Sequence, residues 1–106
     1  MTDGLDRLFA TIAARKAADP STSYTAKLLA AGVEKCAKKF GEEATEAVIA
    51  AIQKDKAELA EESADVLYHL AVLWAASGIT PEEVYAVLKS REGMSGLEEK
   101  ASRSKR

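Results

Sequence analysis

The sequence contains few cysteine, proline and aromatic residues, and this composition excludes several classes of protein. A single cysteine, Cys36, excludes an internal disulfide framework and a zinc site built from several cysteines. No stretch approaches the ~18 consecutive apolar residues that a membrane-spanning helix needs, so we expect no membrane partner. The first residues lack a basic segment followed by an apolar run, so we expect no secretory signal and a cytoplasmic location.

Charge and size set further limits. The net charge is −2 at pH 7, which is not the basic balance of a nucleic-acid-binding domain, so we expect no nucleic-acid partner. A hydrophobic share of 47% is too high for a disordered chain and fits one folded domain over residues 1–106. Aromatic residues are only 6%, so the core must consist of small aliphatic side chains. A chain of this length buries only about 60–68% of its unfolded surface, and we therefore expect a homodimer or higher homo-oligomer.

Alanine is the commonest residue, and only two prolines interrupt the chain, which favours helix. Apolar residues recur at three- and four-residue spacing, and no strand pattern competes with this periodicity. The sequence therefore predicts an all-α fold with about five helices, at about 4–17, 24–31, 33–54, 56–77 and 81–90. Ser23, Asp55 and Thr80 stand at the expected N-cap positions. A polar tail is expected over about 93–106.

The two longest predicted helices are joined by a short connection at Asp55, so we expect them to be antiparallel neighbours. The second carries an apolar stripe from Leu59 to Trp74. The stripe of the first keeps its phase across Gly41 and consists of Val33, Ala37, Phe40, Ala44, Ala47 and Ala51. The sequence predicts that the two stripes face each other and form a buried seam.

A row of acidic residues flanks each stripe. Glu43 and Glu46 lie on the first helix, in a row with Lys39 and Ala50. Glu62 and Asp65 lie on the second, in a row with Glu58 and His69. Both pairs are displaced in the same rotational sense, which places them on one side of an antiparallel seam. Four neighbouring carboxylates repel one another, and a hard divalent cation with oxygen ligands compensates such a cluster. The pattern by itself indicates a metal-binding helical bundle, with solvated surface acids as the alternative.

These residues also resemble a known motif. Glu43-x-x-Glu46, followed after fifteen residues by Glu62-x-x-Asp65, is similar to the metal motif of the all-α nucleoside triphosphate pyrophosphohydrolases, the MazG-like superfamily. Within it, four segments resemble the phosphoribosyl-ATP pyrophosphohydrolase family: residues 23–29, 38–46, 62–70 and 95–100. The resemblance extends over nearly the whole chain. It implies a MazG-like helical bundle whose four-helix core is completed by dimerisation.

The resemblance further implies a reaction. Members of the family hydrolyse the α–β phosphoanhydride of phosphoribosyl-ATP to phosphoribosyl-AMP and pyrophosphate, the second step of histidine biosynthesis. It implies Mg²⁺, with Mn²⁺ as a possible substitute, and makes Glu43, Glu46, Glu62 and Asp65 the catalytic metal ligands. Metal cations neutralise the charge at the reacting phosphates and activate water. Glu42 belongs to the family pattern but projects away from the stripe, so its role as a ligand stays open.

Other residues are candidates for binding the substrate phosphates. Ser23 and Thr25 lie at a helix N-terminus, where free N–H groups favour anions. Lys27, Lys38 and Lys39 could supply positive charge, and a solvated surface position is the alternative for each.

Three residues have less certain roles in this interpretation. His69 continues the acidic row one turn beyond Asp65, and it either contacts the substrate or is a neutral buried histidine. Tyr68 points away from its own stripe, towards a partner chain or the adenine. Arg91 is a candidate for closing over the substrate.

Two other functions stay open on the sequence. A house-cleaning MazG-like nucleoside triphosphate pyrophosphohydrolase would use the same four carboxylates, which therefore do not discriminate between the two enzymes. A non-catalytic helical dimerisation module would use none of them. In that case Glu46→Ala and Asp65→Ala would be neutral or stabilising, because each removes a repulsion.

Overall fold

The computed structural model describes residues 2–93 of the chain, and the side chains from residue 4 onward. Within this range the chain forms five α-helices and no strand, so the all-α prediction is confirmed there. The helices are α1 (Thr2–Ala14), α2 (Tyr24–Ala31), α3 (Val33–Ile52), α4 (Lys56–Ser77) and α5 (Pro81–Ser90), and a 3₁₀ turn, Arg15–Ala17, extends α1. Each boundary lies within three residues of its predicted position. The predicted tail lies, from residue 94 on, outside the described residues.

Local chemistry explains where the helices begin and end. The side chains of Ser23 and Asp55 accept hydrogen bonds from backbone N–H groups three residues later, and so cap α2 and α4. Thr80 and Glu83 form a reciprocal capping box at the start of α5. Gly78 ends α4 with a φ of +76°, a left-handed conformation that costs glycine little.

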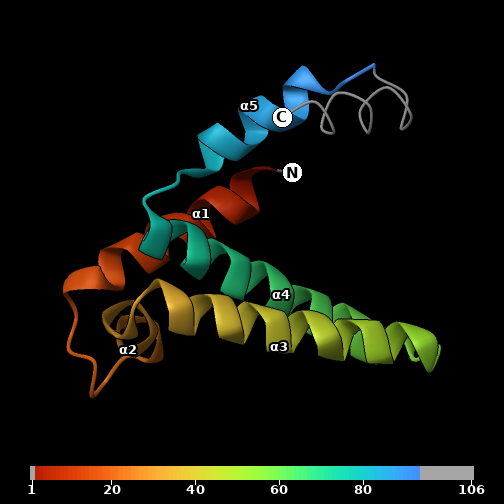
Figure 1. Cartoon of the computed structure of the whole chain (residues 1–106), viewed down its shortest axis with the longest axis horizontal. Coiled ribbons are helices and arrows are strands. Elements are labelled where there is room, and N and C mark those ends of the chain that lie inside the picture. The colour runs from red at the N-terminus through yellow and green to blue at the C-terminus, as the bar shows by residue number, and fades with distance from the viewer. Residues whose placement is uncertain (1, 94–106) are drawn as a thin grey trace.

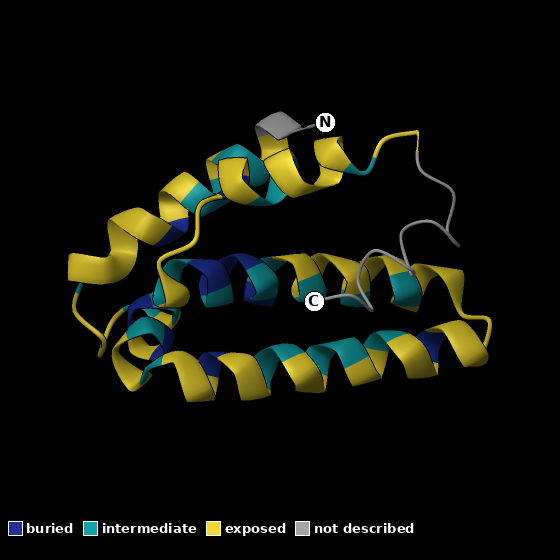
Figure 2. Cartoon of the chain, turned by 45° about the horizontal axis from the view of Figure 1, so that its top comes forward, coloured by how far each residue is buried: buried dark blue, intermediate teal, exposed yellow. Residues whose placement is uncertain are grey.

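The helices α3 and α4 form a long antiparallel hairpin, as the short connection predicted (Figure 1). Near its open end, α1 packs against α4, while α2 contacts both α3 and α4. The helix α5 follows α4 and contacts α1, where the Tyr85 hydroxyl donates a hydrogen bond to Asp6. The buried core lies at this end of the hairpin (Figure 2). Its central residues are Ile12, Leu28, Cys36, Ala71 and Val72.

The rotation of α3 differs from the prediction. Val33, Ala37 and Ala51 of the predicted stripe are exposed, whereas Cys36 and Ala50 are buried. At 100° per residue, the buried face is rotated by roughly 80° from the predicted stripe, towards the acidic row. The acidic row of α3 therefore lies closer to the α3–α4 seam than the sequence pattern indicated.

The hairpin also carries an exposed apolar surface. Val48 is 56% exposed and Ile52 is 74% exposed, both on α3, and Leu67 on α4 is 48% exposed. The radius of gyration is 15.7 Å, larger than the about 13 Å expected of a compact 100-residue domain. The chain thus leaves part of its apolar surface uncovered. None of the helices in residues 2–93 combines the length and the apolar character that crossing a membrane requires.

Candidate metal centre

Three of the four predicted ligands meet at the α3–α4 seam. Glu43 on α3 and Glu62 and Asp65 on α4 each offer a carboxylate oxygen, and these oxygens lie within 4.8 Å of one another. Glu62 and Asp65 are three residues apart and so share a face of α4, which the antiparallel pairing turns towards Glu43. The short connection at Asp55 fixes this register. The sequence-based prediction that α3 and α4 bring their acids together is confirmed for these three residues.

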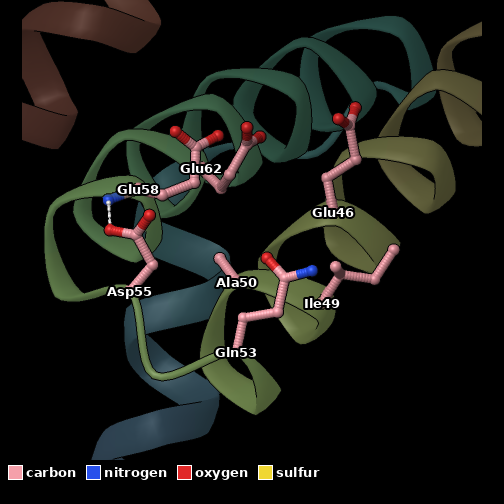
Figure 3. A pocket seen from close by; sticks show the side chains of 7 residues that line it. All are labelled: Glu46, Ile49, Ala50, Gln53, Asp55, Glu58 and Glu62. Atoms are coloured by element: carbon pink, nitrogen blue, oxygen red, sulfur yellow. Dashed lines mark hydrogen bonds between the residues drawn. The ribbon is translucent and has the colours of Figure 1, made fainter.

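The fourth predicted ligand, Glu46, stands one turn along α3 from Glu43. It lines a cavity of about 260 Å³ together with Glu58 and Glu62, and the close-up shows its carboxylate on the opposite wall from theirs (Figure 3). The remaining lining residues are Ile49, Ala50, Gln53 and Asp55. The cavity extends from the carboxylate group towards the closed end of the hairpin, so Glu46 flanks the three-carboxylate group.

The crowding of acids raises the pKa of Glu62. The neighbouring Glu58 carboxyl, which can share a proton with it, is the largest cause that raises the pKa of Glu62 to about 7. Burial and the charges of Glu46, Glu58 and Asp65 raise it further. Glu62 therefore takes up a proton as the pH falls through about 7, as long as no cation compensates the group.

The donor set fits a hard divalent cation. All the converging side chains supply carboxylate oxygens, which is the ligand type that Mg²⁺ takes in proteins. Glu62 Oε1 is buried and lacks a hydrogen-bond partner among the described residues, which is costly for a carboxylate oxygen. A cation bound between Glu43, Glu62 and Asp65 would satisfy this oxygen and remove the repulsion.

His69 lies one turn beyond Asp65 on α4 and is only 6% exposed. Burial lowers the pKa of its imidazole, and the charge of Lys39 acts in the same direction, while Glu43 and Asp65 oppose it. The ring is therefore neutral at pH 7. Its Nδ1 has no hydrogen-bond partner in residues 2–93, so a buried polar atom stays available beside the carboxylates.

The predicted hydroxyl ligands have structural partners. Ser23 Oγ accepts a hydrogen bond from the N–H of Ala26 at 3.1 Å, which is its capping role. The Thr25 hydroxyl is hydrogen-bonded to the hydroxyl of Tyr68, so Tyr68 is turned towards α2. Both roles as substrate ligands stay predictions.

The three predicted lysines separate into two groups. Lys27 and Lys39 line a second cavity, between α2 and α3. Lys38 is exposed and is not among the residues that line it. Glu42, also exposed, forms an ion pair with Lys39 at 3.4 Å, which agrees with its projection away from the predicted metal ligands. Arg91 lies at the end of α5, beside an apolar groove.

Glu58 lines the acidic cavity with Glu62, and helical spacing predicted it in the same row, although not as a metal ligand. Glu58 precedes Glu62 by one helical turn, so the two side chains share a face of α4. The backbone N–H of Glu58 donates to the Asp55 carboxylate at 3.0 Å, which is the capping contact of α4. Its side chain is nevertheless free to face Glu62. Tyr24 and Lys35, which line the second cavity, were not candidates either.

Comparisons with known proteins agree with this arrangement. A sequence model of the family described as phosphoribosyl-ATP pyrophosphohydrolase matches residues 5–92. The chain belongs to this family. A protein of Cereibacter sphaeroides (strain ATCC 17029) is 64% identical over 99 residues, which cover 93% of this chain and 96% of that protein. A protein of Paracoccus denitrificans is 63% identical, covering 94% of this chain and 93% of its own length. A protein of Azospirillum brasilense is 60% identical, covering 93% and 89%.

All three relatives bear the name phosphoribosyl-ATP pyrophosphatase. Their similarity extends across α3 and α4, which supply every carboxylate of the centre. Family membership therefore explains why the chain carries this motif. The geometry explains its spacing, because that spacing brings the acids of α3 and α4 together.

Proposed function

We propose that this chain hydrolyses phosphoribosyl-ATP to phosphoribosyl-AMP and pyrophosphate. The observation that carries the proposal is the convergence of Glu43, Glu62 and Asp65, within 4.8 Å of one another, in a member of the phosphoribosyl-ATP pyrophosphohydrolase family. The relatives' name states the substrate, and the reaction breaks a phosphoanhydride whose products are both anionic. Such chemistry needs positive charge at the reacting phosphates, and a group of carboxylates can hold the cations that supply it.

The proposed cation is Mg²⁺, with Mn²⁺ as a substitute, and Glu43, Glu46, Glu62 and Asp65 are its proposed ligands. When bound, it would neutralise the phosphates and activate a water molecule. Because these side chains come from both helices of the hairpin, they would fix the position of the cation at the α3–α4 seam. The neutral imidazole of His69 would offer a hydrogen bond to the substrate at the edge of the carboxylate group.

We also propose that the working form is a homodimer. The exposed apolar residues Val48, Ile49 and Ile52 share the outer side of α3, and a second copy is the partner that would cover them. Ile49 also lines the acidic cavity, so a copy seated on this side would close that cavity from solvent. A four-helix core formed from two hairpins follows from this arrangement.

The experiment that tests the activity is a turnover assay with purified protein and MgCl₂. Phosphoribosyl-ATP is compared with ATP, dUTP and dCTP, and pyrophosphate release is measured for each. We expect phosphoribosyl-ATP to be the best substrate. A preference for dUTP or dCTP would contradict the proposal and favour a house-cleaning enzyme. No turnover, together with no Mg²⁺-dependent rise in melting temperature, would favour a non-catalytic module.

A further inference from the structure

A second cavity, of about 240 Å³, lies between α2 and the first half of α3. Three lysines from the two helices converge on it, and the lining residues include no carboxylate. The lining consists of Tyr24, Lys27, Leu28, Ala31, Lys35 and Lys39. Lys35 and Lys39 are one turn apart on the same side of α3, and Lys27 approaches from α2.

The charge of this cavity is unusual for the chain, whose net charge is −2. Glu42 pairs with Lys39 at 3.4 Å, and in residues 2–93 no ion pair is formed by Lys27 or Lys35. The three ammonium groups make this cavity a positively charged site, in which Glu42 offsets part of the charge of Lys39. An anion with several oxygen acceptors compensates them, and a phosphate group accepts from several ammonium groups at once.

The cavity stands next to the metal centre. Lys39 precedes the metal ligand Glu43 by one helical turn and Lys35 precedes it by two, so the lysines lie roughly 6 and 12 Å from Glu43 along the axis of α3. The ring of Tyr24 meets the ring of His69 edge-on, with centroids 6.3 Å apart. His69 is itself one turn from Asp65. A single bound molecule can therefore contact both places.

We propose that the lysine cavity binds the phosphomonoester at the end of the substrate remote from the scissile anhydride. This inference rests on the proposed function. Phosphoribosyl-ATP carries a triphosphate at one end and a ribose 5-phosphate at the other, with the adenine between them. The carboxylates of the metal centre would bind the triphosphate through their cation. Lys27, Lys35 and Lys39 bind the 5-phosphate. The half-exposed ring of Tyr24 offers an apolar wall to the sugar beside it.

This assignment gives the cavity a role in specificity. An ordinary nucleoside triphosphate has no phosphate group apart from its triphosphate chain. It therefore leaves the three lysines without an anion. The structure thereby assigns Lys35, which the family motif did not mark, as a residue that distinguishes phosphoribosyl-ATP from ATP.

Steady-state kinetics with phosphoribosyl-ATP test the inference. Lys35→Gln is compared with Lys89→Gln, which removes the same charge from the exposed end of α5. We expect Lys35→Gln to raise KM about tenfold, with kcat changed by less than about twofold, because a charge-assisted hydrogen bond is lost at a partly exposed site away from the reacting atoms. Equal KM values for the two variants would overturn the proposal.

A binding measurement reads the cavity without turnover. Ribose 5-phosphate and ribose are titrated into the metal-free full-length protein, and backbone amide shifts are followed by NMR. We expect shifts over residues 24–39 with ribose 5-phosphate only, and their weakening about tenfold in Lys35→Gln. Shifts that are absent, lie elsewhere or persist unchanged in Lys35→Gln would overturn the proposal. Since this titration needs no metal and no hydrolysis, its result stands apart from failure of the wild-type protein to hydrolyse phosphoribosyl-ATP, which would contradict the proposed function.

Discussion

The hydroxyl groups of Thr25 and Tyr68 are hydrogen-bonded at 2.5 Å, which joins the start of α2 to the middle of α4. The ring of Tyr68 meets that of His69 edge-on, with centroids 4.9 Å apart. This contact therefore connects the helix that carries Tyr24 and Lys27 to the one that carries Glu62 and Asp65. We expect this contact to help hold the lysine cavity beside the carboxylate group.

Removing this hydrogen bond should destabilise the fold modestly. We expect Tyr68→Phe and Thr25→Val each to lower the free energy of unfolding by about 1 kcal/mol, because each leaves one part-buried hydroxyl group unpaired or absent. Urea denaturation of both variants and of the double variant measures the coupling. If the two losses of unfolding free energy are fully additive in the double variant, the hydroxyl groups act independently. The proposed link between α2 and α4 is then wrong.

Replacing Glu62 should separate stability from activity. In EDTA at about pH 8, where Glu62 is charged, we expect Glu62→Gln to raise the melting temperature, since it removes a negative charge from a crowded group. In Mg²⁺ the same variant should lose roughly 10²–10³-fold in turnover, because a cation contributes several kcal/mol to transition-state stabilisation. Glu61→Gln is the matched control on the exposed face of α4. Wild-type turnover by Glu62→Gln would contradict the assignment of Glu62 as a metal ligand.

Stability should depend on pH through the same residue. The folded protein raises the pKa of Glu62 from its ordinary 4.5 to about 7, so the folded state binds more protons than the unfolded state between these values. The contribution of Glu62 to the stability of the metal-free protein is thus fully present below 4.5 and is lost as the pH rises through 7.

Because Mg²⁺ competes with this proton, the rise in melting temperature caused by Mg²⁺ should be larger at about pH 8 than at about pH 5.5. Differential scanning fluorimetry in EDTA and in MgCl₂ at both pH values measures it. Glu62→Gln should reduce the pH dependence. A Mg²⁺ effect that is greater at the lower pH would contradict the prediction.

The turn between α3 and α4 contains a strained residue. Lys54 has a φ of +61°, in the left-handed region that residues other than glycine rarely adopt. We expect Lys54→Gly to stabilise the protein by about 0.5–1 kcal/mol in urea denaturation. Gln53→Gly, at a φ of −76° in the same turn, is the contrasting control and should destabilise it. Equal effects of the two changes would show that Lys54 is not strained.

The proposed dimer interface can be tested by charge. Ile52→Lys places an ammonium group on the exposed apolar side of α3 and should weaken the dimer at least tenfold, because burying one isoleucine contributes about 1.5–3 kcal/mol. Sedimentation velocity over a concentration series measures the effect. Ala10→Lys, at an exposed position on α1, should leave the dimer intact. A wild-type protein that stays monomeric throughout the series would refute the dimer.

Much of the fold could be predicted because its determinants are local. The hydrogen bonds that begin α2, α4 and α5 span only three residues, so Ser23, Asp55 and Thr80 mark these boundaries in the sequence itself. The meeting of Glu43 with Glu62 and Asp65 could be predicted for a related reason. A short turn fixes antiparallel register, and helical periodicity then fixes which side chains are level with one another.

The sequence by itself thus determined the five helices, the hairpin and the carboxylates that converge on it. Only the tertiary structure decided the rotation of α3, which buries Cys36 and Ala50 and leaves Val48 and Ile52 exposed. The periodic pattern shows that a stripe is apolar but not which neighbour covers it. The Thr25–Tyr68 contact and the cavity that Lys35 shares with Lys27 were also decided there. They depend on how α2 packs across the end of the hairpin, and packing between separate helices leaves no spacing in the sequence from which it can be read.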